Sequence, residues 1–160
     1  MYRNIMKGDE AVMLNGVKVT EINVAVRDLD KAVADYEKMG FEEVHRGGSS
    51  VPPVQSRFSN LSFGDDCLLT LMESTDPGSP IDRFIQKRGE GLFSITLMVP
   101  DLDEIQEKLK AAGVELVLDK PLEAENGIIF AMDYKKLRAN YAKPTGPTHG
   151  VVIELDELQR

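Results

Sequence analysis

Two glutamates stand in segments whose residue pattern otherwise predicts half-buried β-strands. In residues 19–26, VTEINVAV, Glu21 shares a face with Asn23, and the branched apolar residues occupy the other face. In residues 150–156, GVVIELD, Glu154 likewise lies opposite the isoleucine and leucine. Two carboxyl groups in a partly apolar cavity repel each other and are poorly hydrated, so at least one should titrate high. Such a pair suits general acid/base chemistry, and Glu21 and Glu154 are the candidate catalytic residues.

Polar residues on neighbouring predicted strands supply candidate binding groups. The segments 67–73, CLLTLME, and 92–99, LFSITLMV, each carry hydroxyl residues on one face of an apolar run. Arg57 begins another predicted strand, where its planar guanidinium could meet a substrate carboxylate or form a surface ion pair. The predicted substrate-binding residues are Asn23, Arg57, Thr70, Ser94, Thr96 and Met98.

An internal repeat relates the two halves of the chain. Residues 19–44 align with residues 92–117 without a gap, because adding 73 to each residue number gives its partner, as Gly40 gives Gly113. Both copies read as a strand, the motif V-x-DLD, a helix, a glycine and a further strand. The first aspartate of each motif suits a helix N-cap, and the glycine suits the helix C-terminus.

The repeat predicts an α+β fold in which two tandem β-α-β-β-β modules form a curved sheet around one cup. Neither module could bury a sheet face and a helix alone, so they are expected to pack as a single domain. A pseudo-twofold axis should make Glu21 face its repeat mate Ser94, and Thr70 should face Glu154. The predicted boundaries are an N-terminal extension at 1–16 and one domain at 17–157, with modules 17–73 and 91–157 and a linker at 74–90.

Composition excludes several function classes. With 160 residues, 42% of them hydrophobic, the chain is long enough to build one core. Its formal charge of -8 repels phosphate backbones, so nucleic acid is not expected as a partner. No apolar run approaches the roughly 20 residues of a membrane span, and no signal-peptide pattern opens the chain. We therefore expect a cytoplasmic protein that does not associate with membranes.

Three further stretches carry a resemblance to a known group of proteins. They are SPIDRFIQKRGEGL at 79–92, KAAGVELV at 110–117 and PTHGVVIELDE at 147–157. With the paired modules that open on V-x-DLD, they resemble the vicinal oxygen chelate superfamily of glyoxalase I, bleomycin-resistance proteins and extradiol dioxygenases. Within it, the likeness is greatest to the methylmalonyl-CoA epimerases. The resemblance implies a vicinal oxygen chelate fold with one cup, and a homodimer.

The same resemblance implies four metal-ligand positions on the cup wall, and the chain departs from the family there. A typical epimerase has histidine at the positions of Glu21 and Ser94, a polar ligand at Thr70 and glutamate at Glu154. Both histidines are replaced, and hydroxyls with carboxylates do not hold transition metals firmly. No cofactor is therefore expected, with a divalent Mg²⁺ or Ca²⁺ completed by water as the alternative.

A second departure concerns the reaction. Where these epimerases carry a proton-transferring glutamate, the stretch VPPVQS at 51–56 has Pro53. Proline cannot move a proton, and a two-base racemisation needs a group on each face of the carbon. True methylmalonyl-CoA epimerase activity is therefore not expected.

Two function classes stay open. The first is an enzyme of the glyoxalase or epimerase-like type, an isomerase or a lyase, in which Glu21 and Glu154 act on a small carboxylate or acyl-thioester. The second is a metal-free protein that binds or sequesters a small molecule. The polar cup wall, with 6% aromatic residues and no tryptophan in the chain, favours the enzyme. The expected partner is a small molecule in both cases, an acyl-CoA ester or a small carboxylate.

The segment 134–149 is predicted to be a loop that joins the last two strands, 127–133 and 150–156. A charged loop is commonly just solvated, but its cations could also meet the phosphates of a coenzyme A ester. These cations are Lys135, Lys136, Arg138 and Lys143.

Overall fold

A computed structural model describes residues 16–50, 55–62, 67–129 and 132–160. Each half of the chain forms the predicted β-α-β-β-β unit, and helix α2 (Pro80–Arg88) lies between the halves. The first unit consists of β1 (Lys18–Ala25), α1 (Leu29–Lys38), β2 (Glu42–Ser49), β3 (Ser56–Ser62) and β4 (Leu68–Ser74). The second consists of β5 (Gly91–Met98), α3 (Leu102–Ala111), β6 (Leu122–Ile129), β7 (Met132–Ala142) and β8 (Val152–Gln159). The predicted extension, except Gly16, and Pro53 lie outside the described residues.

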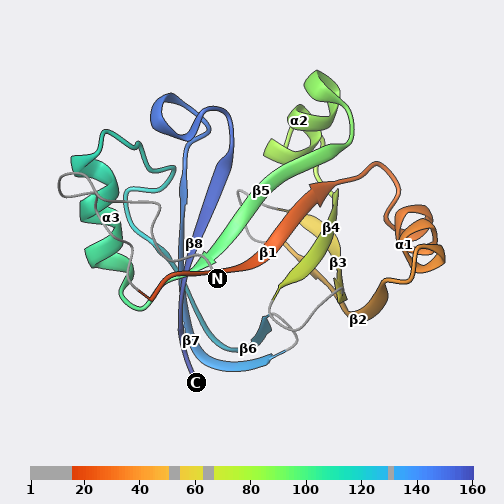
Figure 1. The fold of residues 1–160 in the computed structure, drawn as a ribbon, viewed down its shortest axis with the longest axis horizontal. Coiled ribbons are helices and arrows are strands. Elements are labelled where there is room, and N and C mark those ends of the chain that lie inside the picture. The colour runs from red at the N-terminus through yellow and green to blue at the C-terminus, as the bar shows by residue number, and fades with distance from the viewer. Residues whose placement is uncertain (1–15, 51–54, 63–66, 130–131) are drawn as a thin grey trace, which may run out of the picture.

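The strands form one curved sheet in the order β2-β3-β4-β1-β5-β8-β7-β6 (Figure 1). β1 and β5 pair antiparallel at its centre, and each runs parallel to the last strand of its own unit. Ile22 pairs with Ile95, which is its repeat mate under the offset of 73, so the pseudo-twofold axis passes through this pair. The axis therefore turns equivalent faces of the two units toward a common cup.

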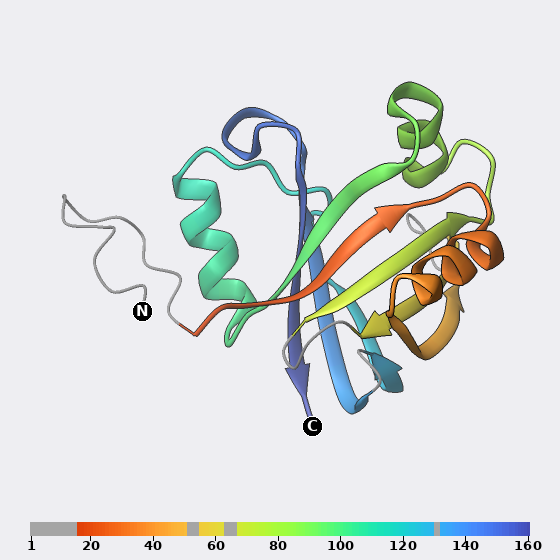
Figure 2. The same cartoon turned by 45° about the vertical axis from the view of Figure 1, so that its right-hand side comes forward.

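Helices α1 and α3 lie outside the curved sheet (Figure 2). α1 packs on β3 and β4, where Leu29 and Leu71 are fully buried in one core cluster. α3 packs on β8, where Leu102 and Leu155 are fully buried in a second cluster. Because side chains alternate along a strand, the apolar faces that meet these helices leave the opposite faces for the cup. Among the described residues, no helix is long and apolar enough to cross a membrane.

The ends of α1 and α3 confirm the local signals of the repeat. The Asp28 and Asp101 carboxylates each accept a hydrogen bond of 2.9 Å from the backbone N–H three residues further on. These bonds satisfy N–H groups that have no partner inside the helix. After each helix, Gly40 and Gly113 take φ values of +95° and +80°, a region that side-chain-bearing residues rarely adopt.

The second unit differs from its predicted layout in three places. The segment 127–133, predicted as one strand, contains the end of β6 and the start of β7, which pair antiparallel. Much of the segment 134–149, predicted as a loop, belongs to β7, because Leu137, Ala139 and Tyr141 alternate with polar residues and pair with β8. The strand predicted directly after the glycine of the repeat is reduced to one isolated bridge, between Leu116 and Ala142. The strand that occupies this place in the unit begins only at Leu122. The charged residues of this segment masked the alternation of apolar and polar residues that predicts a strand.

Candidate active site

Two adjoining cavities occupy the cup. The outer chamber, of about 820 Å³, lies between α2 and the stretch from Lys143 to Val152. The inner chamber, of about 360 Å³, lies between the strands of the first unit and the β6–β7 hairpin. Met72, Tyr141 and Glu154 line both, so the chambers meet at these side chains. A ligand that enters from the outer chamber would therefore reach Glu154 before the inner chamber.

Glu21 and Glu154 are joined through one hydroxyl group. β5 lies between β1 and β8, and its Thr96 is the register partner of both glutamates. Thr96 Oγ1 lies 3.4 Å from Glu21 Oε2 and 3.2 Å from Glu154 Oε2. The structure thus brings the two predicted carboxyl groups into one hydrogen-bonded cluster. Its position at the junction of the chambers gives that cluster access to a ligand.

Two buried asparagine amides support this cluster. Asn60 Nδ2 donates to Glu21 Oε1 at 3.0 Å and to Thr70 Oγ1 at 2.8 Å. Asn23 Nδ2 donates to Ser94 Oγ at 3.0 Å and to Thr96 Oγ1 at 2.9 Å. Glu21 therefore contacts Thr96 rather than its repeat mate Ser94, and Thr70 bonds Asn60 rather than facing Glu154 directly. Both contacts join direct register partners on adjacent strands rather than the pairs that were predicted to face one another.

Sequence reasoning missed Asn60 and Tyr141. Asn60 lies opposite Thr70 in the pairing of β3 with β4, and a register centred on the stretch GDD at 64–66 would have paired them. His45 Nδ1 contacts Asn60 Oδ1 at 3.0 Å, which directs the amide hydrogens toward Glu21. Tyr141, the register partner of Glu154, hydrogen-bonds the Glu154 carboxyl group. Tyr141 was not identified because it lies in the segment 134–149, which was predicted as a loop.

Burial raises the pKa of both glutamates. For Glu21, 9% exposed, burial and then the charge of Glu154 raise the pKa to about 8, although hydrogen bonds from Thr70, Thr96 and Asn60 oppose the shift. Burial also raises the pKa of Glu154, against hydrogen bonds from Tyr141 and Thr96. The direction agrees with the sequence-based expectation. Near neutral pH the cluster can hold a proton and also accept one.

A third carboxyl group lies on the same face of β8. Asp156 is 1% exposed, and neither of its oxygens has a hydrogen-bond partner among the described residues. Burial, followed by the charges of Glu154 and Glu21, raises its pKa well above the ordinary value. Asp156 was not singled out from the sequence, although it follows Glu154 at the spacing of one strand face.

The four wall positions do not fit a transition metal. Thr70 and Ser94 already accept amide hydrogens, and the remaining ligands would be the carboxylates of Glu21 and Glu154. Imidazole or thiolate ligands, which hold transition metals firmly, do not stand at any of the four. Across the described part of the chain, no three histidine, cysteine, aspartate or glutamate side chains are grouped to hold a metal ion.

We predict that protein purified without a chelator contains no stoichiometric zinc, cobalt or nickel. The reason is the donor set, in which hydroxyls that accept amide hydrogens replace imidazole nitrogens. Elemental analysis by mass spectrometry checks this. A stoichiometric transition metal whose occupancy falls in Glu21→Gln or Glu154→Gln would contradict it, and Glu107→Gln on the exposed face of α3 is the matched control.

The remaining predicted binding residues lie in different environments. Asn23 and Thr70 line the inner chamber and Ser94 lines the outer chamber. Arg57 lines neither, because its guanidinium pairs with Glu73 at 2.6 Å. Met98, at the end of β5, also lines neither chamber.

The predicted cationic loop is mostly an ion-paired strand. Arg138 Nη2 lies 2.8 Å from Asp103, and Lys136 Nζ lies 3.2 Å from Glu123. Lys143 does line the outer chamber, where it pairs with Glu115 at 2.9 Å. Lys135 is exposed. Of the four cations, Lys143 alone is placed to meet a ligand in a described cavity.

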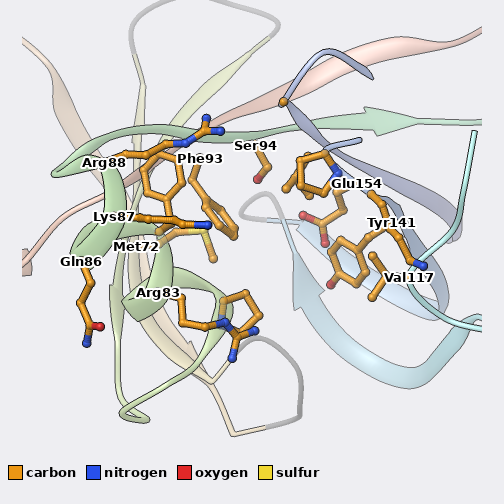
Figure 3. A pocket seen from close by; sticks show the side chains of 16 residues that line it. Met72, Arg83, Gln86, Lys87, Arg88, Phe93, Ser94, Val117, Tyr141 and Glu154 are labelled. Atoms are coloured by element: carbon orange, nitrogen blue, oxygen red, sulfur yellow. The ribbon is translucent and has the colours of Figure 1, made fainter. Parts of the chain in front are cut away.

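The cations that line the outer chamber come mainly from α2, which sequence reasoning treated as a linker helix. Arg83, Lys87 and Arg88 border the cavity on one side, and Glu154 and Tyr141 lie across it (Figure 3). Phe84 and Phe93 stack edge to face there with ring centroids 5.4 Å apart. The outer chamber therefore contains an aromatic pair, despite the low aromatic content that had argued against one.

Comparisons with known proteins agree with this architecture. The family model of the glyoxalase/bleomycin resistance protein/dioxygenase superfamily matches residues 18–132. Methylmalonyl-CoA epimerase from Mycobacterium tuberculosis is 30% identical, with a TM-score of 0.72 over 87% of this chain and 86% of that one. A single-residue variant of Streptomyces coelicolor methylmalonyl-CoA epimerase, in complex with 2-nitronate-propionyl-CoA, is 26% identical, with a TM-score of 0.73 over 88% of this chain and 93% of that one.

A curated relative gives no information on the activity. The uncharacterised protein YqjC of Bacillus subtilis is 27% identical over 143 residues, which are 88% of this chain and 91% of YqjC. The superfamily match and the curled sheet, whose two units form one cup, define the class of protein. The chain belongs to the glyoxalase/bleomycin resistance protein/dioxygenase superfamily, the group that its sequence resembles. Its structural neighbours include methylmalonyl-CoA epimerases.

Proposed function

We propose that the protein is a small-molecule enzyme of this superfamily, an isomerase or a lyase, that moves a proton at the carbon next to an acyl carbonyl. The observation that carries the proposal is the Thr96 hydroxyl joining Glu21 and Glu154 where the two chambers meet. A homodimer and a cytoplasmic location, both expected from the sequence, belong to the same proposal.

The two glutamates take different roles in the proposed reaction. Glu154 borders both chambers, so it is the base that removes the α-proton. Glu21 is more enclosed and, with a pKa near 8, holds a proton at neutral pH. It therefore donates a hydrogen bond to the acyl oxygen, on which negative charge develops as the C–H bond breaks. Return of the proton from Glu154 completes the cycle without a redox partner.

Two observations support an acyl-CoA ester as the substrate. Cations of α2 border the outer chamber, where the phosphates of coenzyme A would find opposite charge. The Streptomyces coelicolor relative forms a complex with 2-nitronate-propionyl-CoA. The small free carboxylate, the other substrate class considered from the sequence, has less support because the groups at the cluster are themselves acidic.

Deuterium incorporation at the α-carbon tests the proposal. Propionyl-CoA is incubated in D2O with the protein, and mass spectrometry follows the gain of mass against a protein-free control. We expect protein-dependent incorporation, because Glu154 would exchange the abstracted proton with solvent. Tight binding without exchange would instead support the binding or sequestering protein, and the absence of both would exclude acyl-CoA esters as ligands.

A further inference from the structure

The two chambers differ in the cations that line them. Among the described residues, the side chains that line the inner chamber include the carboxyl groups of Glu21, Glu123 and Glu154 but no lysine, arginine or histidine. The lining of the outer chamber includes Arg83, Lys87, Arg88 and Lys143. A ligand that spans both chambers would therefore find cations for an anionic group only in the outer chamber.

The cations of α2 are not neutralised by neighbouring carboxylates. None of the ion pairs within the described part of the chain involves Arg83, Lys87 or Arg88. Arg83 donates to the Gly78 carbonyl oxygen, and the Arg88 guanidinium lies 5.9 Å from the centroid of the Phe84 ring. In a chain with a formal charge of -8, these side chains leave positive charge at the outer chamber.

The described lining of the inner chamber offers an entering anion no cation in place of its hydration. Asn23 and Asn60 each use their side-chain amide nitrogen in two hydrogen bonds within the wall. Tyr141 is bonded to Glu154. A carboxylate placed here would lose water, find no cation and lie beside acidic groups, a combination that strongly disfavours a buried charge. An uncharged acyl group incurs no such cost.

We propose that the ligand is an acyl thioester whose anionic part lies in the outer chamber and whose acyl end, seated in the inner chamber, carries no free carboxylate. This inference rests on the proposed function and narrows its substrate class. A volume of about 360 Å³ equals the space of about 12 water molecules, which suits a short acyl chain. The protein therefore selects thioesters of monocarboxylic acids over thioesters of dicarboxylic acids.

Isothermal titration with a matched pair of esters tests this selectivity. Propionyl-CoA and methylmalonyl-CoA differ at the acyl end by one carboxylate, and the full-length protein is titrated with each. We expect propionyl-CoA to bind at least ~10-fold more tightly, a difference of about 1.4 kcal/mol.

Substitutions in the outer chamber distinguish recognition of the anionic part of the ligand from recognition of its acyl end. Lys87→Ala should weaken both esters by a similar factor and leave their ratio unchanged, whereas Lys110→Ala on α3 should change neither. Equal or tighter binding of methylmalonyl-CoA would overturn the inference and leave the proposed acid/base function standing. Binding of neither ester would overturn both. If the protein showed the expected selectivity but no deuterium exchange, the inference would stand and the proposed enzymatic function would be contradicted.

Discussion

Glu154→Gln is expected to lower the rate of α-proton exchange by about 10²- to 10⁴-fold, the range typical for the loss of a general base. The amide is close in volume to the carboxyl group but cannot accept the substrate proton. Because Gln can still bond Tyr141 and Thr96, the fold should persist. The exchange rate of propionyl-CoA in D2O, measured for both proteins at equal concentration, gives the ratio directly.

Glu107→Gln is the control for this substitution. Its side chain lies on α3 with 75% of its surface exposed, so the same chemical change should leave the exchange rate as it was. Circular dichroism of both variants checks that they are folded. If Glu154→Gln exchanged the α-proton at a rate within threefold of the wild type, Glu154 would not be the base.

Glu21→Gln should flatten the dependence of stability on pH. The pKa of Glu21 is raised from 4.5 to about 8 in the folded protein. Between these values the folded state keeps a proton that the unfolded state has released, so the free energy of unfolding falls as pH rises. Below pH 4.5 both states are protonated and the contribution is fully retained. One pKa unit corresponds to about 1.36 kcal/mol, so the difference between the two proteins should reach a few kcal/mol.

Urea denaturation at a series of pH values from 4.5 to 8 measures this effect. Glu154 and Asp156, whose pKa values are also raised, remain in both proteins, so the difference between the two curves isolates Glu21 and its coupling to them. Glu107→Gln should follow the wild type throughout. Parallel curves for wild type and Glu21→Gln would show that the proton is not retained on folding.

Much of the fold was readable because its signals are local. The offset of 73 between repeats reappears as the pairing of Ile22 with Ile95, and both motif aspartates cap their helices. Alternation within the segment of β1 was enough to predict which face Glu21 occupies. β7 was missed because charged residues obscured the alternation of Leu137 and its neighbours, not because the signal was absent.

The sequence by itself determined the two-unit plan and placed both glutamates on the wall of one cup, since periodicity and a gapless repeat specify which faces are turned inward. Only the tertiary structure decided which side chains touch. Strand order puts β5 between β1 and β8, so Thr96 joins Glu21 to Glu154, and the hairpin of β3 and β4 brings Asn60 to Glu21. The cations of α2 likewise reach the outer chamber only through the packing of that helix. Periodicity assigns a residue to a face, but hydrogen bonds and charge pairing depend on neighbours that are distant in the chain.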